Sequence, residues 1–347
     1  MKKKKILFII DVEGWTFEIL ANKLKENLND AYEIDILPGS FFEGNMVKLF
    51  IFTNKYDLIH FFWRGYLSLI DNNNMDNYIL SMGYEKEEFY TKFINSKIIT
   101  TSVCDHLYLD EKEKWRTNEV FKYINSYFVT SKKLYDIYEN INKEKLYGVI
   151  NDFVDLNIFK PVIGRKYTNK DKFVFGWVGN SNFVGPNGEE DLKGVNYILK
   201  PAINELKQEG YNIKLKLLDS AQGIIPNEKM PKFYGDIDVY ICTSSTEGTP
   251  MPVLEAMASG LPVISTDVGI VKEAFGKKQK ELILEERTVE ALKSKIKYII
   301  KNYDICEELS KENIESIKKF SINNISQKYY DFFEYNFNNK LSRRKND

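Results

Sequence analysis

Short hydrophobic runs alternate with amphipathic stretches along the first half of the chain. The runs are rich in β-branched and aromatic residues and are bounded by polar turns, which is typical of buried strands. Strands are expected at residues 5–10, 32–37, 57–62, 97–103, 126–131 and 146–150. Residues 15–28 have the apolar spacing of a helix. Because strands that alternate with helices form parallel sheets covered on both faces, this half predicts a doubly wound α/β domain.

The pattern stops in the middle of the chain and then starts again. Residues 151–172 are polar, contain a proline and lack a clear period, so we interpret them as a hinge. Further strands are expected at residues 173–179, 213–219, 238–244, 261–266 and 281–285. We therefore predict two doubly wound, Rossmann-like domains, residues 1–160 and 161–321, that face a central cleft. Ligands of such sheets bind at the carboxyl ends of the strands.

Composition supports two domains and excludes several classes of protein. A chain of 347 residues that is 43% apolar can bury two cores. A net charge of -1 excludes a dedicated nucleic-acid binder. The three cysteines have neither metal-ligand spacing nor the pattern of a disulfide framework, which favours a reducing, cytoplasmic setting. The apolar run after Lys2 to Lys5 is too short for a membrane span. We interpret these lysines as exposed residues that open a strand, and peripheral contact with anionic lipid on the inner face of the membrane is the alternative.

One segment carries the clearest chemistry. In SSTEGTPMPVLEAMASG (Ser244 to Gly260), Glu247 follows a predicted strand and Glu255 lies about one turn inside the next helix. The amino end of a helix offers free amides and a partial positive charge, which suit a diphosphate. Carboxylates accept hydrogen bonds from adjacent sugar hydroxyls. Two carboxylates on either side of a phosphate-binding turn therefore predict a nucleotide sugar as the ligand.

The same segment, continued through LPVISTDVGIVKE, resembles the donor-site signature of GT-B glycosyltransferases and is most similar to glycosyltransferase family 4. The stretch GVINDFVDLNIFKP (148–161) resembles the interdomain segment of that family, and FSINNISQKYYDFFE (320–334) resembles its last helix. The resemblance implies that a C-terminal helix over residues 322–340 completes the first domain. It also implies retaining transfer from a nucleotide diphosphate sugar, with no cofactor and no obligatory metal.

The resemblance also assigns roles in the donor site. By position, Glu255 would hold the ribose hydroxyls, and Glu247 would hold the donor sugar as a catalytic residue. The backbone of the turn between them would meet the sugar and the phosphates, through Gly248, Thr249, Pro250 and Met251. Asn180 stands where the family has an arginine, and the family's lysine, here Lys193, follows only after an insertion. We expect Lys193 and the amides from Asn180 to Asn182 to hold the diphosphate.

The first domain supplies fewer recognisable residues. Gly14 replaces a glycine-rich pair of the family and would let the backbone approach the phosphates, with Trp15 beside it as a platform for a sugar. Arg64 follows a strand end and is one of only six arginines, so we expect it to bind the acceptor.

The resemblance implies a histidine near the end of the fourth strand of the first domain. Cys104 occupies that position here, followed by Asp105 and His106. We take Asp105 and His106 as candidate catalytic residues that bind the acceptor or the transferred sugar.

The sequence thus predicts a hexosyl or N-acetylhexosaminyl transferase of bacterial glycan or glycoconjugate assembly. UDP-sugars are favoured over GDP-sugars, and the acceptor is a glycan, a lipid-linked molecule or a protein. Two alternatives remain: a nucleotide-sugar epimerase of the same fold, and a non-catalytic nucleotide-sugar-binding subunit, which Asn180 and the displaced His106 favour. The pair Asp236 and Asp238 has the spacing of a metal motif, but it begins a strand, opposite to the ligand-binding end. We therefore expect no metal.

Overall fold

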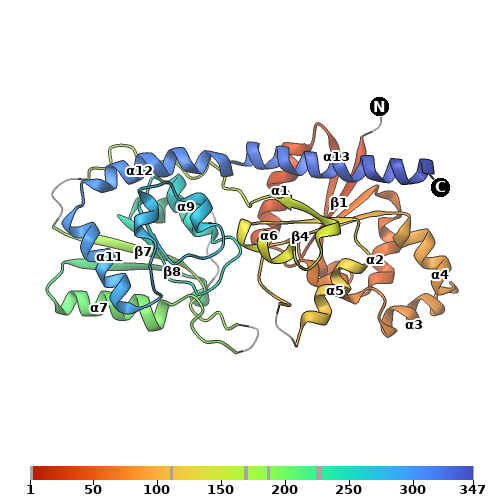
Figure 1. Ribbon diagram of the computed structural model, residues 1–347, viewed down its shortest axis with the longest axis horizontal. Coiled ribbons are helices and arrows are strands. Elements are labelled where there is room, and N and C mark those ends of the chain that lie inside the picture. Colours follow the sequence, from red (N-terminus) through yellow and green to blue (C-terminus); the bar gives the residue numbers. More distant parts are fainter. Residues whose placement is uncertain (1–2, 110–111, 168–170, 186–187, 224–228, 347) are drawn as a thin grey trace. The chain divides into compact units, whose positions relative to one another are not determined.

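Each half of the chain folds on its own parallel sheet (Figure 1). The computed structural model describes residues 3–109, 112–167, 171–185, 188–223 and 229–346. The first compact unit comprises Met1–Asn151 with Ile322–Asp347, and the second comprises Asp152–Ser321. Residues 152–160 fall in the second unit. The predicted α/β class with two doubly wound parallel sheets is confirmed.

The sheet of the first unit has six parallel strands in the order β2-β1-β3-β4-β5-β6. Its strands are β1 (Lys4–Ile10), β2 (Tyr32–Pro38), β3 (Leu58–Phe61), β4 (Ile98–Val103), β5 (Ser126–Val129) and β6 (Leu146–Val149). Its helices are α1 (Thr16–Leu28), α2 (Met46–Phe52), α3 (Asn73–Ser81), α4 (Lys86–Phe89), α5 (Lys114–Lys122), α6 (Lys132–Tyr138) and α13 (Ile322–Asn346).

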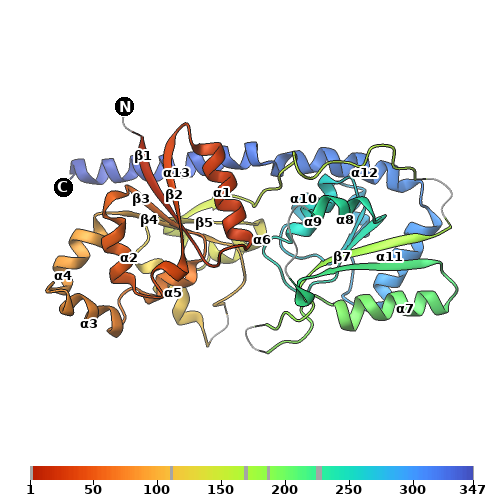
Figure 2. The same ribbon diagram turned by 180° about the vertical axis from the view of Figure 1, so that it is seen from behind.

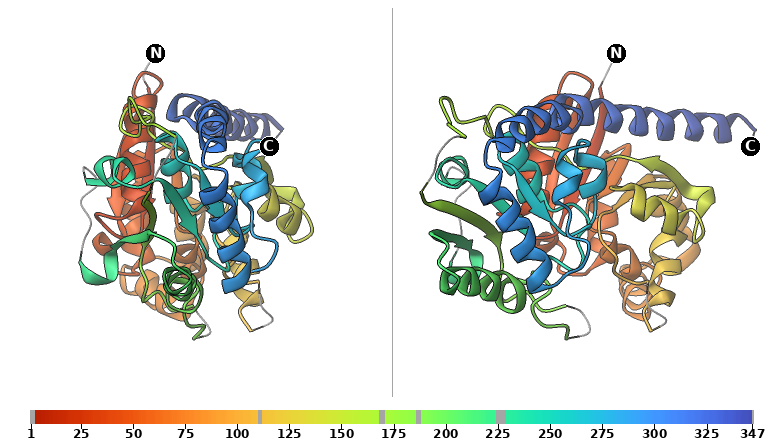
Figure 3. Two further views of the ribbon diagram at one scale, coloured as in Figure 1. Left: turned by 90° about the vertical axis from the view of Figure 1, so that its left-hand side faces the viewer. Right: turned by 60° about the vertical axis from the view of Figure 1, so that its left-hand side comes forward.

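Strand β1 shows why this sheet is covered on both faces. Its side chains alternate between faces, and those from Ile6 to Ile10 are all buried. Leu7 and Ile9 join the hydrophobic cluster with α2 and α3, whereas Phe8 packs against Phe333 of α13. Helix α13 also contacts α1, and Figure 3 shows it as one continuous helix.

The second sheet has four parallel strands in the order β10-β9-β7-β8. Its strands are β7 (Phe173–Gly179), β8 (Ile213–Asp219), β9 (Val239–Cys242) and β10 (Val263–Ser265). Its helices are α7 (Lys200–Gln208), α8 (Met230–Gly235), α9 (Met251–Ala258), α10 (Val271–Ala274), α11 (Val289–Lys301) and α12 (Ile305–Ser316). Alternation again fills two cores: Tyr240 faces the cluster with α8 and α9, and Ile241 faces the cluster with α7 and α11, which contact each other (Figure 2).

The strand predicted at 281–285 does not form. A 3₁₀ turn at Gln279–Leu282 occupies its start, and only a single bridge, Ser265 to Ile283, remains. The side chain of Gln279 takes the place of a strand: its amide nitrogen donates to the Val263 carbonyl at 2.6 Å, and its oxygen accepts from the Val263 amide at 3.3 Å. A buried side chain thus satisfies the outer edge of β10, which local hydrophobicity does not reveal.

Other expectations from the sequence concern the linker and the membrane. In the expected hinge, the described residues contain an isolated bridge from Val154 to Ser321 but no named helix or strand. Across the described ranges, no helix is both long enough and apolar enough to cross a membrane. Lys2 lies outside the described residues, whereas Lys4 and Lys5 open β1.

Candidate functional site

The turn between β9 and α9 has the form that the sequence predicts. Pro250 precedes the helix and Pro252 lies in its first turn, where a missing amide proton costs no intrahelical bond. Within the described part of the chain, no side chain caps the amides of that turn. Gly260 follows the helix in a left-handed conformation, with φ of +73°. Pro252 has no amide proton and the Val253 amide donates to the Pro250 carbonyl at 2.9 Å, so the Met251 amide is the donor that the start of α9 offers to an anion.

A second loop supports this turn from behind. The Thr266 hydroxyl donates to the Ser244 carbonyl at 2.6 Å. Gly269, with φ of +47°, lies so close that a Cβ atom there would be 2.0 Å from the carbonyl oxygen of Gly248. Only glycine fits this contact, because both the backbone conformation and the space exclude a side chain. These contacts hold the backbone of the turn in a fixed position relative to the end of β9.

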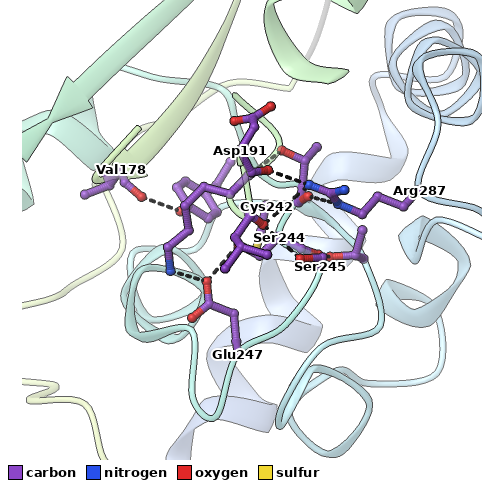
Figure 4. Close-up of polar contacts among 12 residues, drawn as sticks. Val178, Asp191, Cys242, Ser244, Ser245, Glu247 and Arg287 are labelled. Carbon is purple, nitrogen blue, oxygen red and sulfur yellow. Dashed lines mark hydrogen bonds and ion pairs between the residues drawn. The ribbon is translucent and has the colours of Figure 1, made fainter. Parts of the chain in front are cut away.

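Glu247 and Lys193, predicted separately, form an ion pair. The Lys193 Nζ lies 2.6 Å from Glu247 Oε1, and the Ser244 hydroxyl donates to the same oxygen at 2.7 Å (Figure 4). The side chains of Lys193 and Glu247 are 23% and 17% exposed, so both remain accessible to a ligand. The carboxylate is therefore oriented before any ligand binds, and its cation comes from a segment 54 residues away.

A network around Thr243 positions the lysine. The Thr243 hydroxyl donates to the Lys193 carbonyl at 2.8 Å. Arg287 Nε donates to the Thr243 carbonyl and its Nη2 to the Asp191 carbonyl, both at 2.8 Å. Gly194, with φ of +70°, packs so tightly that a Cβ atom would lie 2.4 Å from the Thr243 carbonyl oxygen. Arg287 thereby links the turn that carries Lys193, here called the lysine turn (residues 191–194), to the end of β9, as Figure 4 shows.

Asp191 holds the other side of the lysine turn. It is 7% exposed, and its carboxylate accepts from the amides of Val195, Asn196 and Tyr197 at 2.7 to 3.0 Å. These amides open the helical segment that leads into α7, so the aspartate acts as its cap. The acidic run before Lys193 therefore ends in a structural aspartate.

We expect the Arg287→Gln variant to lower the free energy of unfolding by about 1–3 kcal/mol, because two carbonyl groups lose a charged donor. For a unit of this size, that corresponds to a fall of several degrees in melting temperature. Differential scanning calorimetry measures it, with the exposed Lys301→Gln of α11 as a control for the lost charge. Equal melting temperatures for the two variants would contradict a structural role for Arg287.

Glu255 lies on α9 beside a buried tyrosine. The Tyr234 hydroxyl, on α8, donates to Glu255 Oε2 at 2.7 Å. Burial raises the pKa of Glu255 to about 7. A carboxylate that is partly buried and held by a neutral donor retains one oxygen for a further hydroxyl.

The linker adds a carboxyl group to the same turn. Asp152 lies next to Thr249, and burial raises the pKa of Asp152 to about 6. The polar linker pattern gives no signal for this contact.

The proposed diphosphate contacts after β7 need correction. Asn180 is exposed, and its side-chain oxygen accepts from the Asn182 amide at 2.9 Å. The Ser181 amide donates to Asp219 Oδ1 at 3.0 Å. Two of the three amides expected to bind phosphate, those of Ser181 and Asn182, are thus already satisfied within the protein, because the loop forms an Asx turn that is tied to the end of β8.

In the first unit, the structure changes the interpretation of Arg64. Its side chain is 1% exposed, and Nη2 donates to Asp105 Oδ1 at 2.6 Å and to the Leu107 carbonyl at 2.8 Å. A guanidinium committed to burial in this way holds the loop after β4 and does not present itself to an acceptor, so the acceptor role predicted for Arg64 is wrong. Asp105 is accordingly an ion-pair partner. His106 follows it in the loop, and burial lowers its pKa.

Gly14 and Trp15 lie in the loop after β1. Gly14 has φ of +79°, and its amide donates to Glu18 at 2.5 Å. Trp15 is 63% exposed, which suits a stacking surface for a ligand. Both residues and the loop after β4 stand at the carboxyl edge of the same parallel sheet.

Comparisons with known proteins agree on the fold and on part of the second unit. Residues 214–316 match the family model described as glycosyl transferases group 1. TuaC of Bacillus subtilis (strain 168), which is named for teichuronic acid biosynthesis, is 35% identical over 92 residues, covering 26% of this chain and 21% of TuaC. The curated relatives that the chain matches are covered over 21–43% of their own lengths.

Solved structures match nearly the whole chain. Anabaena HepE in complex with UDP and glucose has a TM-score of 0.67 at 14% identity, covering 96% of this chain and 100% of HepE. Sucrose-phosphate synthase from Thermosynechococcus elongatus has a TM-score of 0.66 at 16% identity, covering 96% and 99%. At these identities the likeness shows the fold, which is the predicted GT-B fold.

Proposed function

Residues 214–316 place this chain among the group 1 glycosyltransferases, and on that premise we propose that it is a retaining glycosyltransferase. It transfers a hexosyl or N-acetylhexosaminyl group from a nucleoside diphosphate sugar to an acceptor hydroxyl in bacterial glycan or glycoconjugate assembly. The observation that carries the proposal is the Lys193–Glu247 pair, oriented at the end of β9 beside a glycine turn and the uncapped start of α9. UDP is favoured as the nucleotide because Anabaena HepE was solved with UDP and glucose.

Each part of the turn has a role that follows from its chemistry. Glu255 accepts hydrogen bonds from the ribose hydroxyls, and Glu247 accepts them from the donor sugar. Lys193 and the Met251 amide bind the diphosphate. The Gly248 backbone approaches the ligand closely because no side chain intervenes. Fixed dipoles and one cation then meet the negative charge that builds up on the leaving diphosphate.

Retention follows from attack on the face that the diphosphate leaves. The bond between the anomeric carbon and the phosphate oxygen breaks, and its electron pair stays on the diphosphate. The acceptor oxygen bonds to the anomeric carbon, and its proton passes to a diphosphate oxygen. Glu247 Oε1 is already held by Lys193 and Ser244, which favours a binding role over a nucleophilic one. Proton NMR of the product reports the anomeric configuration.

The first unit supplies the acceptor side in this proposal. Trp15 is its best candidate contact, since it is exposed and Arg64 is not. The acceptor is a glycan, a lipid-linked molecule or a protein, and the enzyme works in the cytoplasm with peripheral contact to the inner face of the membrane.

One observation favours a non-catalytic nucleotide-sugar-binding subunit instead. The amides of Ser181 and Asn182 already donate within the protein and are not available to the diphosphate. Lys193 is then the one charged group that we assign to the diphosphate. The two functions differ in turnover. A binding subunit would bind the nucleotide sugar without hydrolysing it or transferring the sugar, whereas the proposed enzyme slowly hydrolyses the donor in the absence of an acceptor.

A thermal-shift series tests the function directly. Nucleoside diphosphates and their sugars are added to the purified protein, and a ligand at 100 times its dissociation constant adds about 2.7 kcal/mol to stability. The proposal expects stabilisation by UDP and UDP-sugars, and loss of it in Glu255→Ala. Absence of stabilisation by every nucleoside diphosphate would overturn the proposal.

We expect activity to survive treatment with EDTA. Asp236 pairs with Lys216 at 2.8 Å and with Lys232 at 3.2 Å, and the lysines lower its pKa. Asp238 accepts from the Val174 amide at 2.7 Å. Both carboxylates are thus committed to the protein. Loss of transfer in EDTA and its recovery with manganese would show that a metal is required.

A further inference from the structure

A basic cavity lies at the amino edge of the first sheet, opposite to the edge that carries Gly14 and Asp105. It has a volume of about 450 Å³, within the range of small-molecule sites. Its walls come from the starts of β1 and β4, from the turns before β3 and β4, and from α13. The lining residues are Lys4, Asn54, Lys55, Tyr56, Asp57, Lys92, Ser96, Lys97, Ile98, Phe337 and Lys340.

The lining is strongly biased in charge. Five of its eleven residues are lysine, whereas lysine makes up 43 of the 347 residues of the chain, so composition does not account for the cluster. The one acidic residue is Asp57, and its carboxylate already accepts from the Lys5 amide at 2.8 Å. A concave surface lined by charges of one sign concentrates the field and attracts counter-ions of the opposite sign.

Lys97 shows that the cavity is built into the fold. It is 9% exposed, and its ammonium donates to the carbonyls of Asn54 at 2.8 Å and of Tyr56 at 3.2 Å. Burial lowers the pKa of Lys97. An ammonium has three donors, and the two carbonyls use two of them. Its position between two strand ends is therefore fixed.

Lys55 and Lys92 complete the cluster without a carboxylate partner. Lys55 lies over the rings of Phe52 and Tyr56, at 5.0 and 5.1 Å, and Lys92 over that of Tyr84, at 5.1 Å. Within the described ranges, neither lysine forms an ion pair.

By contrast, the charge of Lys4 is partly balanced. Its ammonium pairs with Glu334 at 3.0 Å and lies 4.0 Å from the centre of the Phe337 ring. The Lys340 ammonium donates to the Ser96 carbonyl. Positive charge that no ion pair among the described residues balances is carried by the remaining lining lysines, Lys55, Lys92 and Lys97.

We propose that this cavity binds a phosphate group, held by Lys55, Lys92 and Lys97. Ammonium groups from separate elements suit a tetrahedral anion, which accepts point-charge donors from several directions. The phosphate comes either from the headgroup of an anionic lipid or from a dissolved phosphate ester. The cavity shares no residue with the turn between β9 and α9, and the proposal does not rest on the proposed function.

The test removes two of the ammonium groups while leaving Lys97 and its backbone contacts in place. The variant is Lys55→Gln with Lys92→Gln. The matched control, Lys207→Gln with Lys301→Gln, makes the same change in charge at exposed positions of α7 and α11. Circular dichroism verifies folding of all variants.

Two probes distinguish the sources of phosphate. Flotation compares phosphatidylcholine vesicles with vesicles that also contain phosphatidylglycerol, and calorimetry uses inorganic phosphate at constant ionic strength. We expect at least one probe to bind the parent and the control alike, and to bind the double variant about tenfold or more weakly. Binding to anionic vesicles alone assigns a lipid headgroup, and binding of dissolved phosphate assigns a soluble ester. Equal binding by the double variant and the control, or no binding of either probe to the parent, would overturn the proposal.

Discussion

Glu247→Ala is expected to slow sugar transfer at saturating donor by a factor of about 100 or more, and to bind the bare nucleoside diphosphate about as well as the parent does. The reason lies in where the carboxylate stands. Ser244 and Lys193 hold it at the end of β9. In the proposed function it meets the sugar there and not the base or the ribose. Transfer rates and titration calorimetry with the nucleoside diphosphate measure the two effects separately.

Lys193 provides the control, because it shares the ion pair. Lys193→Gln should weaken binding of the nucleoside diphosphate by about tenfold or more, since a charged contact to phosphate is lost. If Glu247 served only to hold the lysine, the two single variants would have the same phenotype and the double variant would be no worse. Equal loss of nucleotide affinity in both single variants would contradict a separate role for Glu247.

Glu255→Ala should show the reverse balance, losing affinity for the nucleoside diphosphate first. Loss of charge-assisted hydrogen bonds to ribose corresponds to about 1.5–3 kcal/mol, or a factor of about 10 to 150. Calorimetry with UDP and with its 2′-deoxy analogue makes the test specific. The parent should prefer the ribose form, and the variant should not discriminate. Tyr234→Phe, which removes only the donor to Glu255, should lose less. Discrimination that survives in Glu255→Ala would remove the ribose assignment.

The pKa of Glu255 gives this contact a pH dependence. Its value in the folded protein, about 7, lies above the ordinary value of 4.5, because burial disfavours the charged form. The protonated Glu255 side chain therefore contributes to the free energy of unfolding. This contribution is complete below pH 4.5 and is lost as the pH rises through 7, since the folded state must then ionise a buried group. Nucleotide affinity should change in the opposite sense and increase as the carboxylate forms. Glu255→Gln should abolish both trends.

Hydrophobic pattern was sufficient to predict the two parallel sheets, because each buried strand reads as a short apolar run. It failed at residues 281–285, where the outer edge of β10 is satisfied by the Gln279 amide, a tertiary contact that leaves no periodic signal. The turn between β9 and α9 was also predictable, since glycine, proline and two glutamates mark it in the local sequence.

The contacts that hold this turn were not predictable. Lys193 meets Glu247 across 54 residues, and Arg287 reaches two carbonyls that any residue would provide. Arg64 was misassigned because an arginine after a strand end looks the same in sequence whether it faces a ligand or Asp105. Backbone partners and burial distinguish these cases, and both are set by the whole fold.

The side-chain amide of Gln279 also affects how this protein meets other copies of itself. An open sheet can recruit a foreign strand at either edge. At β10 the outward groups of Val263 are already paired with Gln279, which Asn313 in turn holds by donating to its oxygen at 2.7 Å. At the other edge, β8 carries the exposed Lys214, whose charge opposes pairing with a second strand. In the second unit, the β10 edge is therefore protected because its backbone groups are paired, and the β8 edge is protected by charge repulsion. Both features oppose growth into an intermolecular sheet.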